Sequence, residues 1–139
     1  MICYVDASVL LRVILEAPER LPEWPSVDEG VSSELLRVEC RRALYRVRSL
    51  DALDDERLVT AFDASDALYT KIEFAVLNRA VLRRASDLFP TPLGTLDAIH
   101  LATALLWQDD ANRPLDAFLT HDLELGRAAR AMGLRVLGC

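Results

Sequence analysis

The chain has 139 residues, of which 52% are hydrophobic and 27% charged, and its formal net charge is −6. This length suits a single domain with a substantial hydrophobic core, and the composition excludes a disordered or fibrous chain. No apolar run reaches the roughly 18–20 residues of a membrane-spanning helix, and no signal segment precedes the first apolar run. We therefore expect a cytoplasmic protein that makes no contact with a membrane.

The three cysteines argue against a fold held together by zinc or disulfides. Cys3, Cys40 and Cys139 are widely spaced, and neither His100 nor His121 has a cysteine at the spacing of a zinc site. Free thiols are typical of a reducing compartment.

The predicted elements alternate between strands and helices along the whole chain. Short apolar or β-branched runs predict strands over residues 2–5, 30–33, 70–76, 115–120 and 134–137. Apolar positions at helical spacing predict helices over residues 7–16, 34–49, 78–89, 96–107 and 123–132. A further helix is expected to open at Asp51, Asp54, Asp55 and Glu56 and to include Tyr69.

Strands that alternate with helices imply an α/β fold with a parallel sheet covered on both faces. The expected architecture is a three-layer α/β/α domain over residues 1–139, with a short parallel sheet of about four to five strands. The helix over residues 96–107, which Thr95 is expected to cap, is apolar nearly all round and should therefore be buried.

Four acidic residues fall where such a sheet would bring them together. Asp6 directly follows the first strand, and Asp122 follows the strand over residues 115–120. Asp97 lies in the first turn of the buried helix, and Glu39 lies one to two turns into the helix after the second strand. Because ligands of open parallel sheets bind beyond the carboxyl ends of the strands, we expect these carboxylates to converge at one edge.

Each of these acids also has a purely structural interpretation. Asp6 and Asp122 could cap the helices that follow them, and Asp97 could favour the positive end of a helix dipole. Glu39 could pair with an arginine along its own helix. Together, however, four carboxylates at one edge would repel one another unless a cation neutralises them. Hard oxygen ligands suit Mg²⁺ or Mn²⁺, which can activate a water for attack on a phosphodiester.

Four segments resemble the acidic motifs of PIN domains. Residues 5–8 (Val-Asp-Ala-Ser) are similar to the opening Asp-x-Ser, and residues 32–42 are similar to the helix that carries the glutamate. Residues 95–104 (Thr-Leu-Asp-Ala-Ile-His-Leu-Ala-Thr-Ala) are the most specific segment and match the third acid. Residues 119–122 (Leu-Thr-His-Asp) are similar to the Thr-x-Asp that supplies the fourth. Among PIN domains, the chain resembles the VapC toxins of VapBC toxin–antitoxin systems.

The resemblance implies a compact α/β/α domain that is a metal-dependent endoribonuclease and usually a homodimer. The cut would leave a 5′-phosphate and a 3′-hydroxyl, and a small VapB-like antitoxin would fold around the toxin and block its site. Four residues would then be both catalytic and metal-binding: Asp6, Glu39, Asp97 and Asp122.

Two assignments stay open at this point, together with two supporting roles. Glu34 lies five residues before Glu39 and could face the metal instead, although the Glu-x-x-Arg match favours Glu39. Asp116, nearer the start of its strand, could replace or support Asp122. Ser8 and Thr120, each two residues from an acid, could orient a carboxylate or hold a metal-bound water.

Three kinds of function are compatible with parts of this pattern. A negative net charge is unusual for a protein that binds RNA, but the cations are mostly arginines, and Arg42 and Arg46 are candidates to contact RNA. A non-catalytic PIN-like module that binds RNA or protein is the main alternative to a ribonuclease. A phosphatase with an aspartyl-phosphate is disfavoured because its second Asp is replaced here by Ser8.

The first helix is more apolar than one buried face requires. We expect part of it, with the helix over residues 34–49, to form a groove for an antitoxin or a dimer contact, while simple burial against the sheet is the alternative. Its apolar residues are Leu10, Leu11, Val13, Ile14 and Leu15.

Overall fold

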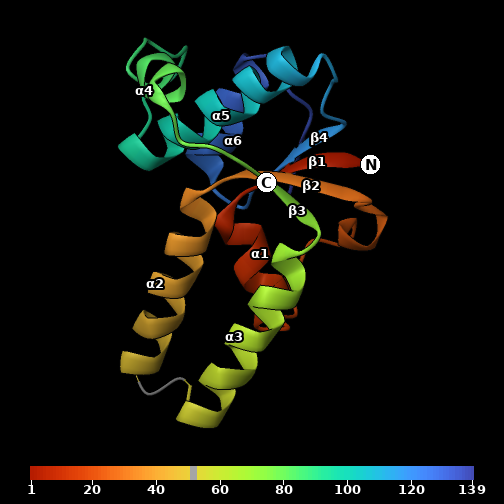
Figure 1. Cartoon of the computed structure of the whole chain (residues 1–139), viewed down its shortest axis with the longest axis vertical. Helices are drawn as coiled ribbons and strands as arrows, with labels where there is room; N and C mark the ends of the chain where they lie inside the picture. The colour runs from red at the N-terminus through yellow and green to blue at the C-terminus, as the bar shows by residue number, and fades with distance from the viewer. Residues whose placement is uncertain (51–52) are drawn as a thin grey trace.

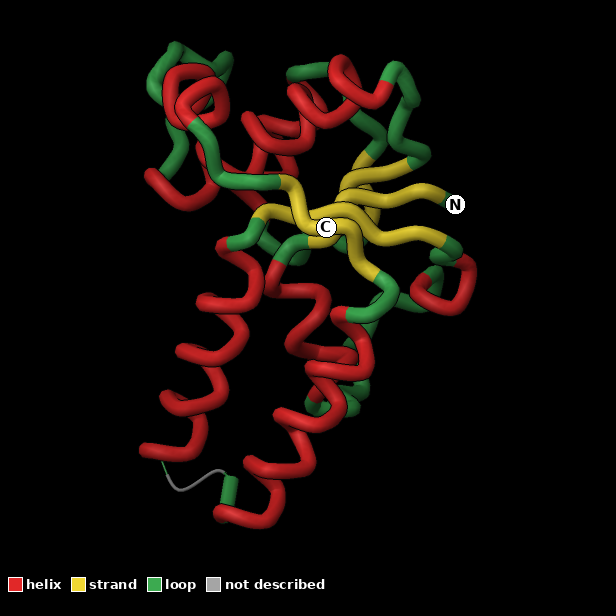
Figure 2. The backbone as a smooth tube through the Cα atoms, in the orientation of Figure 1, coloured by secondary structure: helices red, strands yellow, loops and turns green. Residues whose placement is uncertain are grey.

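A parallel sheet between two groups of helices forms the protein, as the computed structural model shows for residues 1–50 and 53–139 (Figures 1 and 2). Within these residues, five strands pair in the order β3-β2-β1-β4-β5, and every pair is parallel. The strands are β1 (Ile2–Val5), β2 (Glu29–Ser33), β3 (Ile72–Ala75), β4 (Ala117–Leu119) and β5 (Val136–Leu137). The helices are α1 (Ala7–Ile14), α2 (Leu35–Ser49), α3 (Asp55–Tyr69), α4 (Arg79–Ala85), α5 (Thr95–Ala111) and α6 (Leu123–Ala131), with a short 3₁₀ helix η1 (Trp24–Ser26). The expected three-layer α/β/α fold is confirmed.

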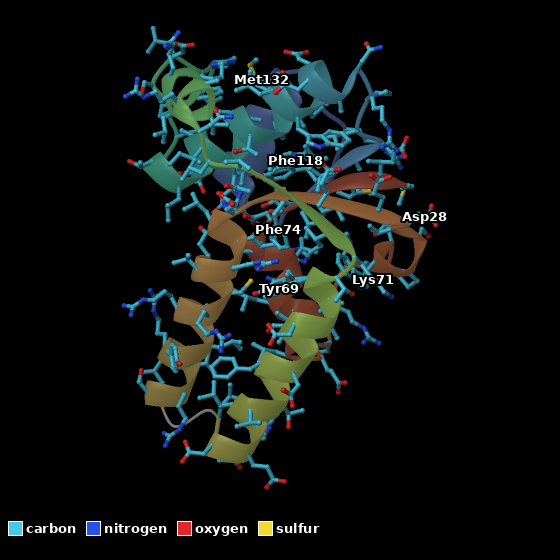
Figure 3. The ribbon with its side chains drawn as sticks, viewed as in Figure 1. Asp28, Tyr69, Lys71, Phe74, Phe118 and Met132 are labelled. Atoms are coloured by element: carbon cyan, nitrogen blue, oxygen red, sulfur yellow. The ribbon has the colours of Figure 1, made fainter. Side chains whose placement is uncertain are left out.

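The two faces of the sheet are covered by different halves of the chain. Helices α1, α2 and α3 lie on one face, and α4, α5 and α6 lie on the other (Figure 1). Side chains of β1 alternate between the two cores: Cys3 and Val5 pack with the first group, and Tyr4 packs with the second. Phe118 of β4 stacks on Tyr4 with ring centroids 4.8 Å apart, on the side of α5 and α6 (Figure 3).

Helix α5 is the most buried helix of the second layer, as its apolar composition predicts. It runs four residues beyond the expected end, until Asn112 adopts a left-handed conformation with φ 48° and closes the helix. At its start the capping residue is Gly94, so the expectation that Thr95 caps this helix is wrong. No helix in the described ranges of the chain has both the length and the apolarity to cross a membrane.

Three other helix ends differ from the expected ones for local reasons. Helix α1 ends at Ile14, because Glu16 has φ 51° and cannot continue it. Helix α4 starts after Asn78, whose side chain accepts hydrogen bonds from two backbone amides, and ends at Ala85 rather than near residue 89. Helix α3 is capped by Asp54, while Asp51, which was expected to help open this helix, lies outside the described residues.

Candidate active site

The topology brings Asp6, Asp97, Asp122 and Glu39 to the carboxyl edge of the sheet. Asp6 follows β1 and Asp122 closely follows β4, and these two strands are neighbours in the sheet. Asp97 comes from the first turn of α5, and Glu39 comes from α2 on the opposite face. The four carboxylates are close enough for the charges of the other three to raise the pKa of Asp97.

Asp6 is held by two hydroxyl groups from separate parts of the chain. Its Oδ2 atom accepts hydrogen bonds from Ser8, through both the backbone amide and the hydroxyl, and from the Thr120 hydroxyl at 2.9 Å. In turn, the backbone amides of His121 and Asp122 donate to the hydroxyls of Ser8 and Thr120, each at 2.9 Å. Both hydroxyls that were expected to orient a carboxylate therefore contact Asp6, and they also join the ends of β1 and β4.

Asp122 caps a helix while leaving part of its carboxylate free. Its Oδ1 atom accepts from the backbone amides of Glu124 and Leu125 at 2.8 and 2.9 Å, which is the geometry of an N-cap. Asp6 likewise caps α1 through Oδ2. The structural interpretation of both residues is therefore correct, and it is compatible with a place in the site.

Glu39 is bound to a buried histidine that sequence reasoning missed. The Glu39 Oε2 atom lies 2.6 Å from His100 Nε2, and His100 Nδ1 lies 2.8 Å from the hydroxyl of Tyr4. Burial acts to lower the pKa of His100, but the hydrogen bond and charge of Glu39, with the charges of Asp6 and Asp97, outweigh it and raise that pKa. One signal was available: His100 follows Asp97 by three residues in an apolar helix, and this spacing places both on one side of it.

Asp97 is the carboxylate with the least support. Burial, and then the negative charges of Asp122, Asp6 and Glu39, raise its pKa to about 6, while the charge of His100 acts in the opposite direction. No hydrogen bond to its carboxylate is found among the described residues. Asp97 is thus a partly buried acid among like charges, which a cation would stabilise in its ionised form.

The free oxygens of the four acids suit a hard divalent cation. Within residues 1–50 and 53–139, no hydrogen bond engages Asp6 Oδ1, Asp122 Oδ2, Glu39 Oε1 or either oxygen of Asp97. Such oxygen donors are the ligands that Mg²⁺ and Mn²⁺ prefer. In the same part of the chain, no three His, Cys, Asp or Glu side chains are already arranged to share one ion. The donor set fits the metal, and the side chains would have to draw together to bind it.

Comparison with known proteins identifies the family of this chain. Residues 3–131 match the family model of the PIN domain. The chain belongs to the PIN domain family. Its relatives include "Ribonuclease VapC47" of Mycobacterium tuberculosis strain CDC 1551 / Oshkosh, which is 31% identical over 94% of this chain and 91% of the relative. "Ribonuclease VapC46" of strain H37Rv is 31% identical over 96% and 95%, and "Ribonuclease VapC35" is 32% identical over 96% and 94%.

Two other candidate acids of this PIN domain have structural partners of their own. Glu34 Oε2 accepts a hydrogen bond from the backbone amide of Leu77 at 3.1 Å, so this carboxylate fastens the segment after β3. Asp116 precedes β4, and its carboxylate accepts from the backbone amide of Ile2 at 2.7 Å, at the amino-terminal edge of the sheet. The expectation that Asp116 supports the site is corrected, because the length of β4 separates it from Asp122.

Most arginines of α2 have structural partners. The guanidinium of Arg37 lies 4.2 Å from the ring centre of Phe74, which is on the α2–α3 side of the sheet (Figure 3), and that of Arg41 lies 4.0 Å from Phe62. Arg48 pairs with Asp55. In contrast, Arg42 and Arg46 line a groove of about 420 Å³ beside Glu39, so they are the arginines of this helix that lie next to the candidate site.

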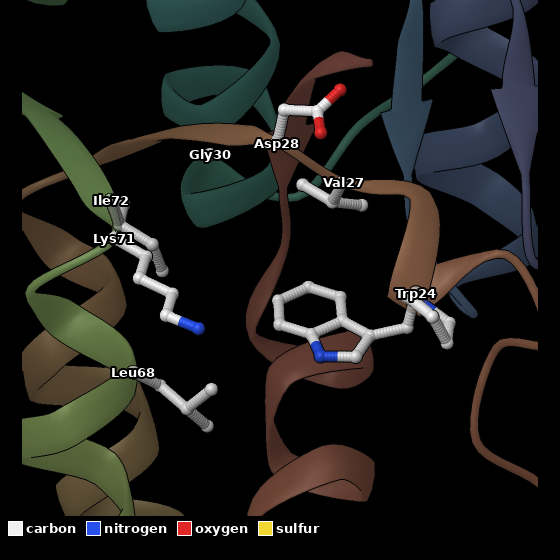
Figure 4. Close-up of a pocket in the computed structure, with 8 residues that line it drawn as sticks. Trp24, Val27, Asp28, Gly30, Leu68, Lys71 and Ile72 are labelled. Carbon is white, nitrogen blue, oxygen red and sulfur yellow. The ribbon is translucent and has the colours of Figure 1, made fainter.

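A separate hollow lies at the opposite edge of the sheet. It has a volume of about 140 Å³, and Trp24, Lys71 and Ile72 are among the residues that line it (Figure 4). Its single carboxylate, Asp28, pairs with the amino group of Met1. Among the described residues, no cluster of acids lines this hollow.

Replacing Asp97 with Asn should stabilise the metal-free protein, because it removes a partly buried carboxylate that has lost hydration and that its acidic neighbours repel. The pKa of Asp97 is about 6 in the folded protein and 3.8 without its surroundings, so the native state loses stability as pH rises through this window. We expect a gain of about 1 kcal/mol in the free energy of unfolding at neutral pH, or about 3 °C in Tm, after allowance for partial exposure.

Thermal denaturation in EDTA over a series of pH values measures this effect. The gain of Asp97→Asn over the wild type should shrink as the pH falls and vanish near about pH 4, where the wild-type carboxyl is also neutral. A clear drop in Tm at neutral pH would instead show that Asp97 stabilises the start of α5.

Substitutions of Glu34 and Glu39 should differ in their effect on Mn²⁺ affinity. Glu34→Ala removes the acceptor for Leu77 and should lower the free energy of unfolding by about 1 kcal/mol without changing Mn²⁺ affinity. Glu39→Gln should weaken Mn²⁺ binding measured by calorimetry. Weaker binding in the Glu34 variant alone would assign the metal to Glu34.

Proposed function

We propose that this chain is a single-domain, metal-dependent endoribonuclease that acts in the cytoplasm as the toxin of a type II toxin–antitoxin pair. The observation that carries the proposal is the cluster of four carboxylates, from four separate elements, with free oxygens at the carboxyl edge of the sheet. Relatives named ribonuclease, which align over more than nine-tenths of their length, support the same reaction.

Asp6, Glu39, Asp97 and Asp122 are the residues that would hold Mg²⁺ or Mn²⁺. When bound, such an ion lowers the pKa of water and stabilises negative charge that develops on the phosphate. The chain itself fixes the direction of its donors: hydroxyls of Ser8 and Thr120 hold Asp6, a helix terminus holds Asp122, and His100 holds Glu39. Hydrolysis would add the oxygen of water to phosphorus and break the bond to the 3′-oxygen, leaving a 5′-phosphate and a 3′-hydroxyl.

The net charge of −6 is compatible with an RNA substrate because of how the charges are distributed. Four of the acids lie in the cluster, where a divalent cation would offset them. Arg42 and Arg46 line the groove beside Glu39, and neither forms an ion pair within residues 1–50 and 53–139. Guanidinium groups bind phosphate through two hydrogen bonds, so we assign the RNA backbone on either side of the cut to these arginines.

The same groove is where we place a VapB-like antitoxin. Leu10 and Ile14 of α1 are buried in the core, as the simple interpretation of this helix predicts, but Leu11 lines the groove. Val38 of α2 and Leu96 of α5, which also line it, are 58% and 48% exposed. An amphipathic helix could cover this apolar surface and block the acids next to it.

We further propose a homodimer, which light scattering of the purified protein would test.

The second candidate is a PIN domain that binds RNA or protein without cleaving it. It is favoured by the absence, in the described residues, of three side chains already arranged around one ion. A ribonuclease hydrolyses RNA when metal is present, whereas a binding domain does not, so one cleavage assay separates the two candidates.

Purified wild type should cut total cellular RNA into discrete products with Mg²⁺ or Mn²⁺, and EDTA should abolish the products. Asp97→Asn should lower the rate by about 100-fold or more, because it weakens the metal site on which the reaction depends. Asp110→Asn is the matched control: it makes the same substitution near the other end of α5, at an exposed residue, and should leave the rate unchanged. Equal cleavage by the wild type and Asp97→Asn would refute the proposal, and Mn²⁺ binding without cleavage would favour the non-catalytic module.

Val38→Arg should separate antitoxin binding from catalysis. The substitution places a charge in the apolar groove, so affinity for a VapB-like antitoxin should fall by about tenfold or more. RNA cleavage should not be abolished, because Val38 contributes no carboxylate to the cluster and an added arginine does not repel the phosphates of RNA in the groove that Arg42 and Arg46 also line. Unchanged affinity, measured by calorimetry with both purified proteins, would place the antitoxin elsewhere.

A further inference from the structure

A continuous line of buried hydrogen bonds connects the backbone of the sheet to Glu39. The backbone amide of Ser33 donates to the hydroxyl of Tyr4 at 3.2 Å. This hydroxyl lies 2.8 Å from His100 Nδ1, and His100 Nε2 lies 2.6 Å from Glu39 Oε2. Tyr4 and His100 are 0% and 1% exposed, so water does not compete for these bonds. The line crosses from β2 through β1 and α5 to α2.

The chemistry of these groups sets the direction of the last hydrogen bond. The Tyr4 hydroxyl accepts from the amide of Ser33, so its own proton is available to His100 Nδ1. A neutral imidazole that accepts at Nδ1 carries its proton on Nε2 and donates it to Glu39. A doubly protonated ring also carries a proton on Nε2. In both forms His100 is the donor and the carboxylate of Glu39 is the acceptor.

The rings in this line are more deeply buried and more closely packed than the glutamate at its end. Tyr4 stacks on Phe118 with an angle of 13° between the rings, and His100 meets Tyr4 edge-on at 5.9 Å. Glu39 has a long side chain that is 22% exposed, and the bond to His100 is the one hydrogen bond that its carboxylate makes in the part of the chain that the structure describes. Without this bond, the Glu39 carboxylate would be free to rotate into the neighbouring groove.

We propose that His100 is a positioning residue for Glu39 and that Tyr4 anchors His100 to the sheet. By holding Oε2, His100 leaves Oε1 of Glu39 for a divalent cation and reduces the loss of side-chain freedom when the cation binds. The role of the cation rests on the proposed function, whereas the hydrogen bond itself does not. A histidine that orients a carboxylate in this way acts as the outer support of a metal site.

Calorimetric Mn²⁺ titrations of matched variants test the proposal. His100→Leu fills the space without a donor and should weaken Mn²⁺ binding by about 10- to 100-fold. His100→Gln retains an N–H near the position of Nε2 and should recover most of the lost affinity. Tyr4→Phe removes the anchor and should give a smaller loss than His100→Leu.

A double-mutant cycle distinguishes positioning from general structural damage. If His100 acts through Glu39, then His100→Leu should cause little further loss of Mn²⁺ affinity in a Glu39→Gln background. Trp107→Phe is the matched control, because Trp107 of the same helix donates a 2.9 Å hydrogen bond to Glu73 and should be replaceable without loss of Mn²⁺ affinity. Wild-type affinity in folded His100→Leu, or losses that add fully with Glu39→Gln, would overturn the proposal.

Nitrogen NMR of the metal-free wild type tests the hydrogen bond without metal or RNA. The Nε2 atom of His100 should carry a proton throughout the pH range in which the protein is folded, and an unprotonated Nε2 would overturn the proposal. RNA cleavage is measured with Mn²⁺ on the variants used in the calorimetric titrations. If the wild type binds Mn²⁺ but does not cut RNA, non-additive losses of Mn²⁺ affinity for His100→Leu and Glu39→Gln still support positioning, while the proposed reaction fails. If the wild type cuts RNA but those losses are additive, the proposed reaction stands and positioning fails. A wild type that binds no Mn²⁺ would refute both.

Discussion

Repulsion among the carboxylates at one edge of the sheet is the interaction on which the site depends. Like charges brought together in a partly buried place raise one another's pKa and destabilise the folded state. The chain offsets this repulsion unevenly. Asp6, Asp122 and Glu39 each receive hydrogen bonds on one oxygen, whereas Asp97 receives none among the described residues and has its pKa raised to about 6. Burial of Asp97 and the repulsion that remains among the acids are what a divalent cation would offset.

The position of the cluster follows from the sheet itself. In a parallel sheet all strands end at the same edge, so β1 and β4, which are far apart in the chain, deliver Asp6 and Asp122 side by side. The bonds from Thr120 to Asp6 and from His121 to Ser8 then fix the two strand ends to each other. The fold and the site are therefore stabilised by some of the same hydrogen bonds.

The sequence predicts which elements carry the acids, because each of these elements has a clear pattern. Strand periodicity places Asp6 and Asp122, and the apolar helix places Asp97. The sequence favours Glu39 over Glu34, but it could not predict that the amide of Leu77, 43 residues after Glu34, would donate to the Glu34 carboxylate. The pair of Tyr4 and His100 could not be predicted either, because they are 96 residues apart and meet only when α5 packs on the sheet. Local pattern thus determined which residues reach the edge, whereas long-range packing determined how they are held there.

Helix capping and metal binding are often treated as competing explanations of an aspartate at a strand end. Here Asp6 and Asp122 show why they need not compete. A carboxylate has two oxygens, and the cap engages only one of them, so the other has no hydrogen bond within the described residues. The cap also restricts rotation of the side chain, and this restriction lowers the entropic cost of binding an ion with the second oxygen. A helix that begins immediately after a strand therefore stabilises such an aspartate and leaves one of its oxygens for a cation, should one bind there. Asp97 differs because Gly94 provides the cap of α5, so neither of its oxygens is engaged in this way.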